Sequence, residues 1–398
     1  MECHLRILVL TFYYEPDLCA GSFRNTSLVN ELLKQLPKDG QIDVLTTLPN
    51  RYASFNIETL EKEVNDNLTI ERIPLPDHKS GMVDQSKTFF AFASEVIKRT
   101  FDRDYDLVYA SSSRLMTAAL GASIARHKNI PLYLDIRDIF VDTIKDVLPQ
   151  KLAWVMKPTL SAVERLTVRQ AQKVNLVSGG FKQYFESRYP NQSFTYFTNG
   201  IDAEFIDAQP QKKSVSESAI PEVIYAGNFG EGQGLHSIIP QLAKHFDGRL
   251  KFRLFGDGGR RSQLETELEK QQITNVELQT PVSRKDLIKI YQQADVLFLH
   301  LNDYDAFLKV LPSKIFEYAT LGKPIWAGVS GFSAQFLNDN VSNVAVFDPC
   351  NLEAAIKSFE QLELITQPRS TFVKQFSRDV IMRSMAADIL ATDKTRKC

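Results

Sequence analysis

The chain has 398 residues, of which 43% are hydrophobic and 24% are charged, and its formal net charge is −1. This length exceeds that of one ordinary domain, so we expect two domains with the composition of a soluble globular protein. A net charge near zero argues against nucleic-acid binding, which normally goes with a strong basic excess. No apolar run approaches the roughly 20 residues that a membrane-spanning helix needs.

The cysteine and histidine residues are scattered along the chain. The four cysteines form no CxxC pair, and neither they nor the six histidines have the spacing of a metal site, so we expect no protein-held metal. Scattered thiols in a chain of this length fit the reducing cytoplasm. Residues 5–14 form a short apolar run without a basic lead-in, which predicts a strand rather than a signal peptide.

Short apolar runs alternate with helical patterns along the chain. Up to residue 205 we predict strands at 5–12, 42–46, 68–73, 107–110, 132–135, 174–177 and 195–197, and helices that include 23–36, 86–101, 115–127 and 152–171. After a polar stretch at 209–218, further strands are predicted at 223–226, 252–255, 276–278, 296–300, 324–327 and 344–347.

Strands that alternate with helices form βαβ units, and hence parallel sheets covered on both faces. The sequence therefore predicts an α/β protein with two Rossmann-like domains, residues 1–205 and 206–375. We expect a final helix within 376–398 to pack back on the first domain. Ligands of such sheets bind at the carboxyl ends of the strands, so the loops that follow the strands are the candidate sites.

Two loops of the first domain carry suitable residues. After the first strand, Gly21 leads into a helix and permits close backbone approach, with Arg24 in the first helical turn. A later strand ends in Asp135, Arg137 and Asp138, and such adjacent charges are costly if they are buried and unpaired. They form either a ligand site or a mutual ion pair, and the Gly21 loop is either a site or a plain strand-to-helix turn.

Two glycine-rich loops follow the first strands of the second domain. One spans residues 227–234 and contains Asn228, Gly230 and Gln233, and the other reads Phe-Gly-Asp-Gly-Gly from residue 255, with Gly256 and Asp257. Glycine in such positions allows positive φ or lets the backbone lie against a ligand. Both loops are therefore candidates for phosphate binding, and flexible surface turns are the competing interpretation.

The segment 311–325 carries the most informative pattern. A helix should start near Pro312, with Ser313 and Lys314 in its first turn, where unpaired N–H groups and the helix dipole favour an anion. Glu317 lies one turn further on, on the same face. This set suits a nucleoside diphosphate, with Lys314 on the phosphates and Glu317 on the ribose, whereas a solvated amphipathic helix is the alternative.

Taken together, these motifs resemble family 4 of the glycosyltransferases, which are retaining enzymes with two Rossmann-like domains that face each other across a cleft (the glycosyltransferase B-type fold). The resemblance covers nearly the whole chain. It rests on the Gly21 loop and on the segments Thr198–Asp202, Tyr225–Gly230, Phe255–Gly258, Ala294–Val296 and Pro312–Gly322. Within the family, the chain looks like a subgroup that transfers amino or deoxy sugars in O-antigen and capsule synthesis.

The resemblance implies that the second domain holds the donor nucleotide sugar and the first domain the acceptor. Glu317 matches the second glutamate of the family's E-x7-E motif, but Lys309 replaces the first. Asp303 or Asp305 would then contact the sugar in its place.

A second departure concerns the family's Arg and Lys phosphate clamp. Asn228 and Gln233 stand there instead, so that Lys314, Arg24 or Arg260 must supply the positive charge.

The resemblance also implies a reaction, the transfer of a sugar from a nucleoside diphosphate, expected to be UDP, to a hydroxyl group with retention and without a cofactor. Lys314 would stabilise the leaving diphosphate. Arg137 stands closest to the place of the family's catalytic-region His, and Asp138 would orient the acceptor hydroxyl. We expect attack from the leaving group's side, because no nucleophilic carboxylate is evident.

The expected acceptor is a lipid-linked saccharide, and the expected donor sugar is N-acetyl-fucosamine or another amino or deoxy sugar. Basic and aromatic patterns at 151–173 and 87–99 predict peripheral contact with the cytoplasmic face of the inner membrane, with core packing as the alternative. Two other functions stay open: a UDP-sugar 2-epimerase and a non-catalytic nucleotide-sugar-binding partner. The sequence predicts no oligomeric state.

Overall fold

The computed structural model describes residues 5–17, 19–49, 59–76, 82–112, 114–141, 150–208 and 220–392. The chain forms two compact units. The first contains residues 1–199 and 379–398, and the second contains residues 200–378. The boundaries expected from the sequence were 205–206 and 375–376. The polar stretch 209–218 lies outside the described residues.

The first unit is built on an eight-stranded sheet in the order β3-β4-β2-β1-β5-β6-β7-β8. Its strands are β1 (Arg6–Leu10), β2 (Gln41–Thr47), β3 (Lys62–Asn65), β4 (Leu68–Ile73), β5 (Leu107–Ser111), β6 (Leu132–Ile136), β7 (Lys173–Leu176) and β8 (Phe194–Thr195). All neighbours pair in parallel except β3 and β4. The edge strand β3 is missing from the sequence prediction, because its residues are mostly exposed and form no apolar run.

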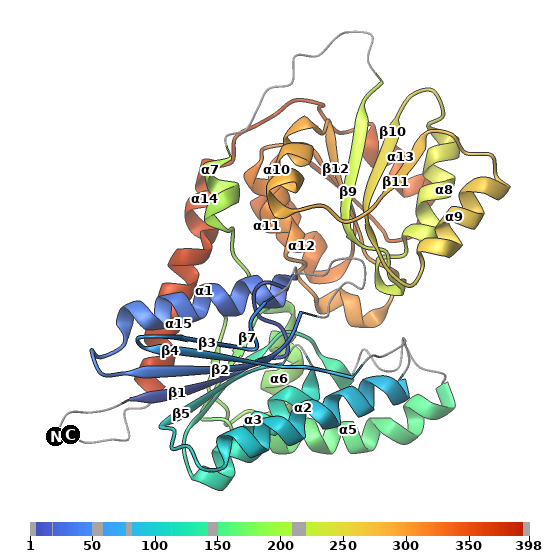
Figure 1. Cartoon of the computed structure of the whole chain (residues 1–398). Coiled ribbons are helices and arrows are strands. Elements are labelled where there is room, and N and C mark those ends of the chain that lie inside the picture. Colours follow the sequence, from blue (N-terminus) through green and yellow to red (C-terminus); the bar gives the residue numbers. More distant parts are fainter. Residues whose placement is uncertain are drawn as a thin grey trace. The chain divides into compact units, whose positions relative to one another are not determined.

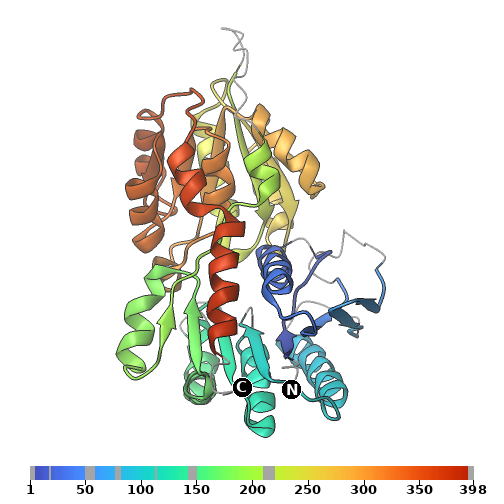
Figure 2. The same ribbon diagram turned by 90° about the vertical axis from the view of Figure 1, so that its left-hand side faces the viewer.

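Helices cover both faces of this sheet (Figure 1). They are α1 (Ala20–Gln35), α2 (Met82–Thr100), α3 (Leu115–Lys128), α5 (Gln150–Gln170), η1 (Gly179–Phe181), α6 (Lys182–Arg188) and α15 (Arg378–Thr392). Leu28 of α1 and Met385 of α15 share one core with Val9 of β1. On the opposite face, a Cβ at Gly121 of α3 would lie 2.6 Å from the Cβ of Ala110 in β5. The last helix therefore returns to the first unit, as predicted (Figure 2).

The second unit contains a six-stranded parallel sheet in the order β11-β10-β9-β12-β13-β14. Its strands are β9 (Glu222–Asn228), β10 (Lys251–Asp257), β11 (Val276–Gln279), β12 (Val296–His300), β13 (Ile325–Gly328) and β14 (Val344–Phe347). Its helices are α7 (Ala203–Asp207), η2 (Glu231–Gln233), α8 (Leu235–His245), α9 (Arg261–Lys270), α10 (Arg284–Gln293), η3 (Asp305–Lys309), α11 (Lys314–Thr320), α12 (Gly331–Asn340), α13 (Leu352–Phe359) and α14 (Ser370–Phe376). Both units are thus α/β layers, as the alternating pattern predicted.

Each sheet has a point where the order of its strands reverses. β1 lies between β2 and β5, and β9 lies between β10 and β12. In open α/β sheets, ligands bind outside the carboxyl ends of the strands at this point. The loops that follow β1, β9 and β12 carry Gly21, the 227–234 segment and Lys314, so these predicted residues lie at the favoured place within each unit.

Candidate functional site

The two glycine-rich loops of the second unit are stacked on each other. Gly227 at the end of β9 pairs in register with Gly256 of β10, and their φ angles are +150° and +153°. A Cβ at Gly256 would overlap the carbonyl group of Gly227, and a Cβ at Gly258 would lie 2.7 Å from Oδ1 of Asn228. Glycine is therefore required at these positions, since only glycine adopts such angles readily and leaves room for the second loop.

The polar residues predicted in these loops interact with one another. Nδ2 of Asn228 donates a hydrogen bond to Oε1 of Gln233 at 2.9 Å, across Gly230. Oδ1 of Asp257 accepts one from the N–H group of Gly258 at 2.8 Å. Asn228, Gln233 and Asp257 are only half-buried, so they hold the loops in shape and still reach the surface.

Lys314 brings a positive charge to the first of these loops. Its Nζ lies against Gly227, where an added Cβ would collide with it, and 5.8 Å from the centre of the Tyr225 ring. The hydroxyl group of Tyr225 donates to the carbonyl oxygen of Asn228 at 2.8 Å, which fixes the ring under the loop. Residues almost 90 positions apart in the sequence thus meet at the end of β9.

The helix that carries Lys314 begins close to the predicted position. α11 starts at Lys314, and Ser313 precedes it with φ −60° and ψ −27° and no side-chain capping bond. The N–H group of Ile315 donates a hydrogen bond to the carbonyl oxygen of Pro312 at 3.2 Å, so the first turn of the helix lies near Pro312, as predicted. The predicted proximity of Lys314 and Glu317 is also present.

Glu317 is half-buried in α11, and burial raises its pKa. Arg284 and Lys314 act against this shift without cancelling it. Arg284 also pairs with Asp202 and with Glu204, at 2.7 Å from the latter. The guanidinium group of Arg284 thus forms ion pairs with two other carboxylates and stabilises the charge of Glu317 only in part.

Arg284 and Asp202 are site residues that sequence reasoning missed or left without a role. Asp202 belongs to the Asn-Gly-Ile-Asp segment quoted for the resemblance, and it pairs with both Arg284 and Arg378. Arg284 follows Ser283, which caps α10 by accepting from the N–H group of Asp286. The capping residue signals a helix start, but nothing local marks Arg284 as a partner for residues of α7 and α11.

His300, the last residue of β12, was also missed. Its buried ring joins two loops, because Nδ1 lies 2.7 Å from the carbonyl oxygen of Gln233 and Nε2 lies 3.0 Å from the N–H group of Cys350. The ring is neutral in this arrangement, donating from Nδ1 and accepting at Nε2. Burial lowers the pKa of His300 to about 4.

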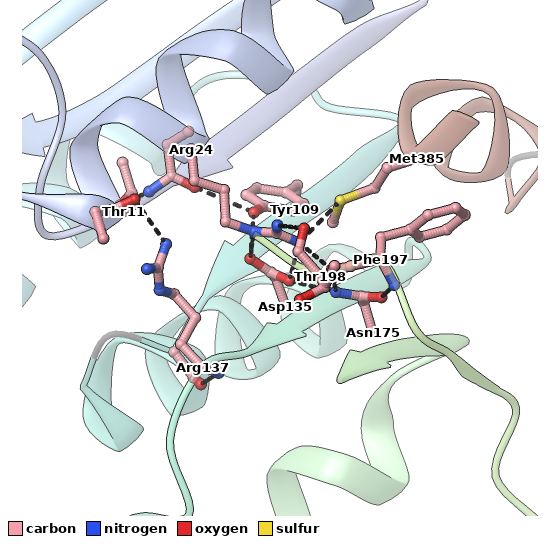
Figure 3. A network of polar contacts seen from close by, with 12 residues as sticks. Thr11, Arg24, Tyr109, Asp135, Arg137, Asn175, Phe197, Thr198 and Met385 are labelled. Carbon is pink, nitrogen blue, oxygen red and sulfur yellow. Dashed lines mark hydrogen bonds and ion pairs between the residues drawn. The ribbon is translucent and has the colours of Figure 1, made fainter. Parts of the chain in front are cut away.

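In the first unit, Arg24 and Asp135 form a closed ion pair (Figure 3). Both side chains are fully buried, and Nε and Nη2 of Arg24 lie 2.8 and 2.9 Å from the two carboxylate oxygens. Arg24 also donates to the carbonyl oxygens of Phe197 and Thr198, and Asn175 donates to Asp135 at 2.7 Å. Burial disfavours the charged carboxylate, but Arg24 outweighs this effect and lowers the pKa of Asp135.

This pair corrects two expectations. Arg24 cannot contact donor phosphates in this structure, because its guanidinium group is enclosed and fully hydrogen-bonded within the first unit. The partner of Asp135 is Arg24 of α1 rather than Arg137, two residues away in the sequence. Nothing in the Asp-Ile-Arg-Asp motif itself indicates this partner, which lies 111 positions away.

Arg137 lies beside the first loop instead. A Cβ at Gly21 would be 3.7 Å from the guanidinium carbon of Arg137, and Nη1 donates a 3.4 Å hydrogen bond to the carbonyl oxygen of Ala20. Arg137 is half-buried and Asp138 is exposed. The structure therefore brings Gly21 and Arg137 together at the strand ends of the first unit, with Asp138 next to them in the chain.

The remaining candidates lie around the loops of the second unit. Arg260 follows β10, is exposed and pairs with Glu231. Lys309 is half-buried at the end of η3, whereas Asp303 and Asp305, which were expected to replace the missing glutamate, are exposed. Arg260 and the two acids thus have access to solvent, unlike Arg24.

Within the described ranges, no group of three or more His, Cys, Asp or Glu side chains is placed to hold a metal ion. Of the helices that the structure describes, none combines the length and the apolar character needed to cross a membrane.

One family of known proteins matches the second unit of the chain. Residues 207–377, which make up most of the second unit, match the family model of "Glycosyl transferases group 1". No curated protein sequence matches the chain.

Solved structures resemble the whole chain. A sucrose-phosphate synthase from Thermosynechococcus elongatus is similar with a TM-score of 0.75 and 12% identity, over 99% of this chain and 100% of that one. Anabaena HepE, solved with UDP and glucose, is similar with a TM-score of 0.66 and 17% identity, over 98% and 100%. WaaG, a glycosyltransferase involved in lipopolysaccharide biosynthesis, is similar with a TM-score of 0.61 and 14% identity, over 98% of both chains.

The chain has the glycosyltransferase B-type fold. At these identities the similarity defines the fold, while the family match in the second unit supports a group 1 glycosyltransferase that uses a nucleotide sugar. The neighbours do not single out the O-antigen and capsule subgroup expected from the sequence.

Proposed function

We propose that the protein is a retaining glycosyltransferase, which moves a sugar from a UDP-linked donor to a hydroxyl group without a metal. The observation that carries this proposal is the placement of Lys314 against Gly227, with Glu317 one helical turn beyond. The family match of the same unit and the UDP complex of a structure with this fold support a nucleotide sugar as the donor.

The main chemical problem of the reaction is the negative charge that develops on the β-phosphate of the leaving diphosphate. Lys314 supplies a cation, and the glycines at 227, 230 and 256 let the loops pack closely against Lys314, Asn228 and each other. Fixed donors of this kind stabilise the transition state, and one of them is typically worth about 3–4 kcal/mol. Glu317 would accept hydrogen bonds from the ribose hydroxyls.

The first unit would bind the acceptor. Asp138 is exposed at the strand ends and is our candidate for orienting the acceptor hydroxyl, while Arg137 next to Gly21 would contribute positive charge. We propose that the acceptor hydroxyl attacks the donor sugar from the side of the leaving group, because we assign no carboxylate as a nucleophile.

We further propose a lipid-linked saccharide as acceptor and an amino or deoxy sugar, such as N-acetyl-fucosamine, as donor sugar, in bacterial surface polysaccharide synthesis. The subgroup resemblance suggests this, and WaaG offers a neighbour in lipopolysaccharide biosynthesis. On α5, Trp154 is 80% exposed and Leu166 67% exposed, beside basic residues. Such a helix suits the cytoplasmic surface of a membrane.

A thermal-shift series with UDP, GDP, ADP and dTDP tests the donor site, because a ligand that binds the folded state raises the melting temperature. We expect the largest shift with UDP and a reduced shift for Lys314→Ala. Lys270→Ala on α9 is the matched control, since this exposed lysine lies away from the loops. A series in which no nucleotide shifts the melting temperature of the wild type would refute the proposal.

One observation favours a second candidate, a non-catalytic nucleotide-sugar-binding partner. Lys309 stands where the family has its first glutamate, so the usual carboxylate contact to the donor sugar is missing at that position. A protein of this kind would give the UDP shift but release no UDP with any lipid-linked acceptor. Incubation with UDP-GlcNAc alone tests the epimerase, which would yield an epimerised sugar.

A further inference from the structure

The first unit contains a cavity of about 420 Å³ that the proposed function does not use. It lies between α5 and α6, and its lining includes Lys157, Ser161, Arg165, Arg169 and Arg188. Its volume is within the usual range of about 300–1,000 Å³ for small-molecule sites.

Four of the lining residues form a regular stripe. Lys157, Ser161, Arg165 and Arg169 recur at every fourth position of α5, and residues four apart lie on the same face of a helix. At a rise of about 1.5 Å per residue, the three cations extend over roughly 18 Å of the cavity wall. The stripe is long enough to contact more than one anionic group.

The cations of this stripe lie close to one another on the surface of the cavity. Lys157, Arg165 and Arg169 are all exposed, and all three line the cavity. Arg165 and Arg169 are four residues apart, and like charges at this spacing repel each other on a helix. An anion that enters the cavity would relieve this repulsion.

The one carboxylate in the lining is held by phenol groups. Glu164 is 5% exposed and accepts hydrogen bonds from the hydroxyl groups of Tyr189, at 2.9 Å, and Tyr184, at 3.2 Å. It therefore lies in the wall of the cavity as the hydrogen-bond acceptor of two phenol groups.

Arg188 is held in place from the α6 side. Its guanidinium carbon lies 3.5 Å from the centre of the Tyr184 ring, and Nη1 donates to the Tyr184 carbonyl oxygen at 3.2 Å. Stacking of this kind fixes the plane of the guanidinium group and leaves its other N–H groups for a ligand. The cavity thus has a preformed cation on one wall and a row of cations on the other.

We propose that this cavity is an anion site for a molecule with two or more phosphate groups, separate from the donor loops of the second unit. Arginine is suited to this task, because its planar N–H groups match the geometry of phosphate oxygens in pairs. The phosphates could belong to a free phosphorylated molecule or to neighbouring lipid headgroups, and the chemistry of recognition is the same for both.

The test uses the full-length protein and measures two kinds of binding. One arm titrates inorganic triphosphate by calorimetry, and the other measures co-sedimentation with vesicles of phosphatidylglycerol against vesicles of phosphatidylcholine. The variant is Arg165→Gln with Arg169→Gln. The control, Lys38→Gln with Lys182→Gln, changes the net charge equally on exposed residues of the same unit.

We expect the pocket variant to weaken binding about tenfold or more, as loss of charge-assisted hydrogen bonds should, and the control to stay within about twofold of the wild type. Binding of triphosphate to the donor loops is common to all three proteins and cancels in the comparison. A loss in the triphosphate arm assigns the site to a free phosphorylated molecule, and a loss confined to anionic vesicles assigns it to headgroups. Equal behaviour of the two variants in both arms overturns the proposal.

A second variant guards against a folding defect. Ser161→Glu places a carboxylate between Lys157 and Arg165, at the spacing that favours ion pairs in a helix. We expect a higher melting temperature together with a loss of anion binding, and unfolding cannot produce both. A variant that binds triphosphate and anionic vesicles as well as the wild type would refute the site.

Discussion

Each unit contains a carboxylate with a nearby arginine, and the two carboxylates have different surroundings. In the first unit, Arg24 of α1 and Asp135 of β6 are fully buried, and the pKa of Asp135 is lowered because Arg24, with Arg137 and Asn175, outweighs burial. In the second unit, Glu317 is half-buried, and its pKa is raised because burial outweighs Arg284 and Lys314. Both carboxylates are subject to desolvation, so the opposite shifts come from their partners.

The difference lies in how each arginine is shared. Arg24 gives both oxygens of one carboxylate a hydrogen bond, whereas Arg284 pairs with Asp202 and Glu204 and only approaches Glu317. A charge that is satisfied inside the protein stabilises the structure, and a charge that is only partly satisfied is a candidate for ligand binding. A carboxylate near an arginine is therefore fully paired in the first unit and only partly paired in the second.

The largest expected effect comes from breaking the closed pair. Arg24→Met should lower the free energy of unfolding of the first unit by about 3–5 kcal/mol, because it leaves Asp135 buried without its cation. Replacing both residues, with Arg24→Met and Asp135→Leu, should recover much of this loss. Urea unfolding monitored by circular dichroism measures both variants. A single variant as stable as the wild type would show that the pair is not structural.

The next effect is a pH dependence in the second unit. His300 has a pKa lowered to about 4 by burial, against about 6.5 when unfolded, so the unfolded chain binds more protons between these values. Its contribution is fully present above pH 6.5 and is lost as the pH falls towards 4, by about 3 kcal/mol over that window.

Unfolding free energies measured from pH 7 to pH 4 test this assignment. His300→Gln should flatten this part of the profile, and His245→Gln, on the surface at the end of α8, should leave it as in the wild type. If His300→Gln keeps the full slope, the pH dependence has another origin.

A third effect concerns catalysis. Lys314→Ala should reduce turnover on the order of a hundredfold if its ammonium group stabilises the leaving diphosphate. Release of UDP from a UDP-sugar in the presence of a lipid-linked saccharide measures this, with Lys270→Ala as the control. Turnover at the wild-type rate would exclude Lys314 from contact with the phosphates.

The sequence predicted what depends on short-range pattern. Apolar runs located the parallel strands, and the glycines at 227 and 256 marked loops that can stack only because glycine has no Cβ. The pairing of Arg24 with Asp135 joins residues 111 positions apart, and no local pattern encodes it. The edge strand β3 was not predicted for a related reason, because it is defined by its pairing with β4 and not by its own apolar residues.

The smallest effect on stability is expected from a substitution of Glu317, the carboxylate that is only partly paired. A carboxyl group whose folded pKa is raised binds more protons in the folded state above its ordinary pKa, so stability falls as the pH rises through that region. Glu317→Gln removes the charge, and the ligand-free protein should therefore melt at a higher temperature at pH 7, with little change at pH 4.

The same substitution should weaken UDP binding about tenfold, because an amide accepts hydrogen bonds from the ribose less strongly than a carboxylate does. Melting curves with and without UDP give both quantities from one protein. A gain in stability with a loss of ligand is typical of a residue kept for binding rather than for folding. If Glu317→Gln instead melts at a lower temperature and binds UDP normally, Glu317 belongs with Asp135 among the structural charges.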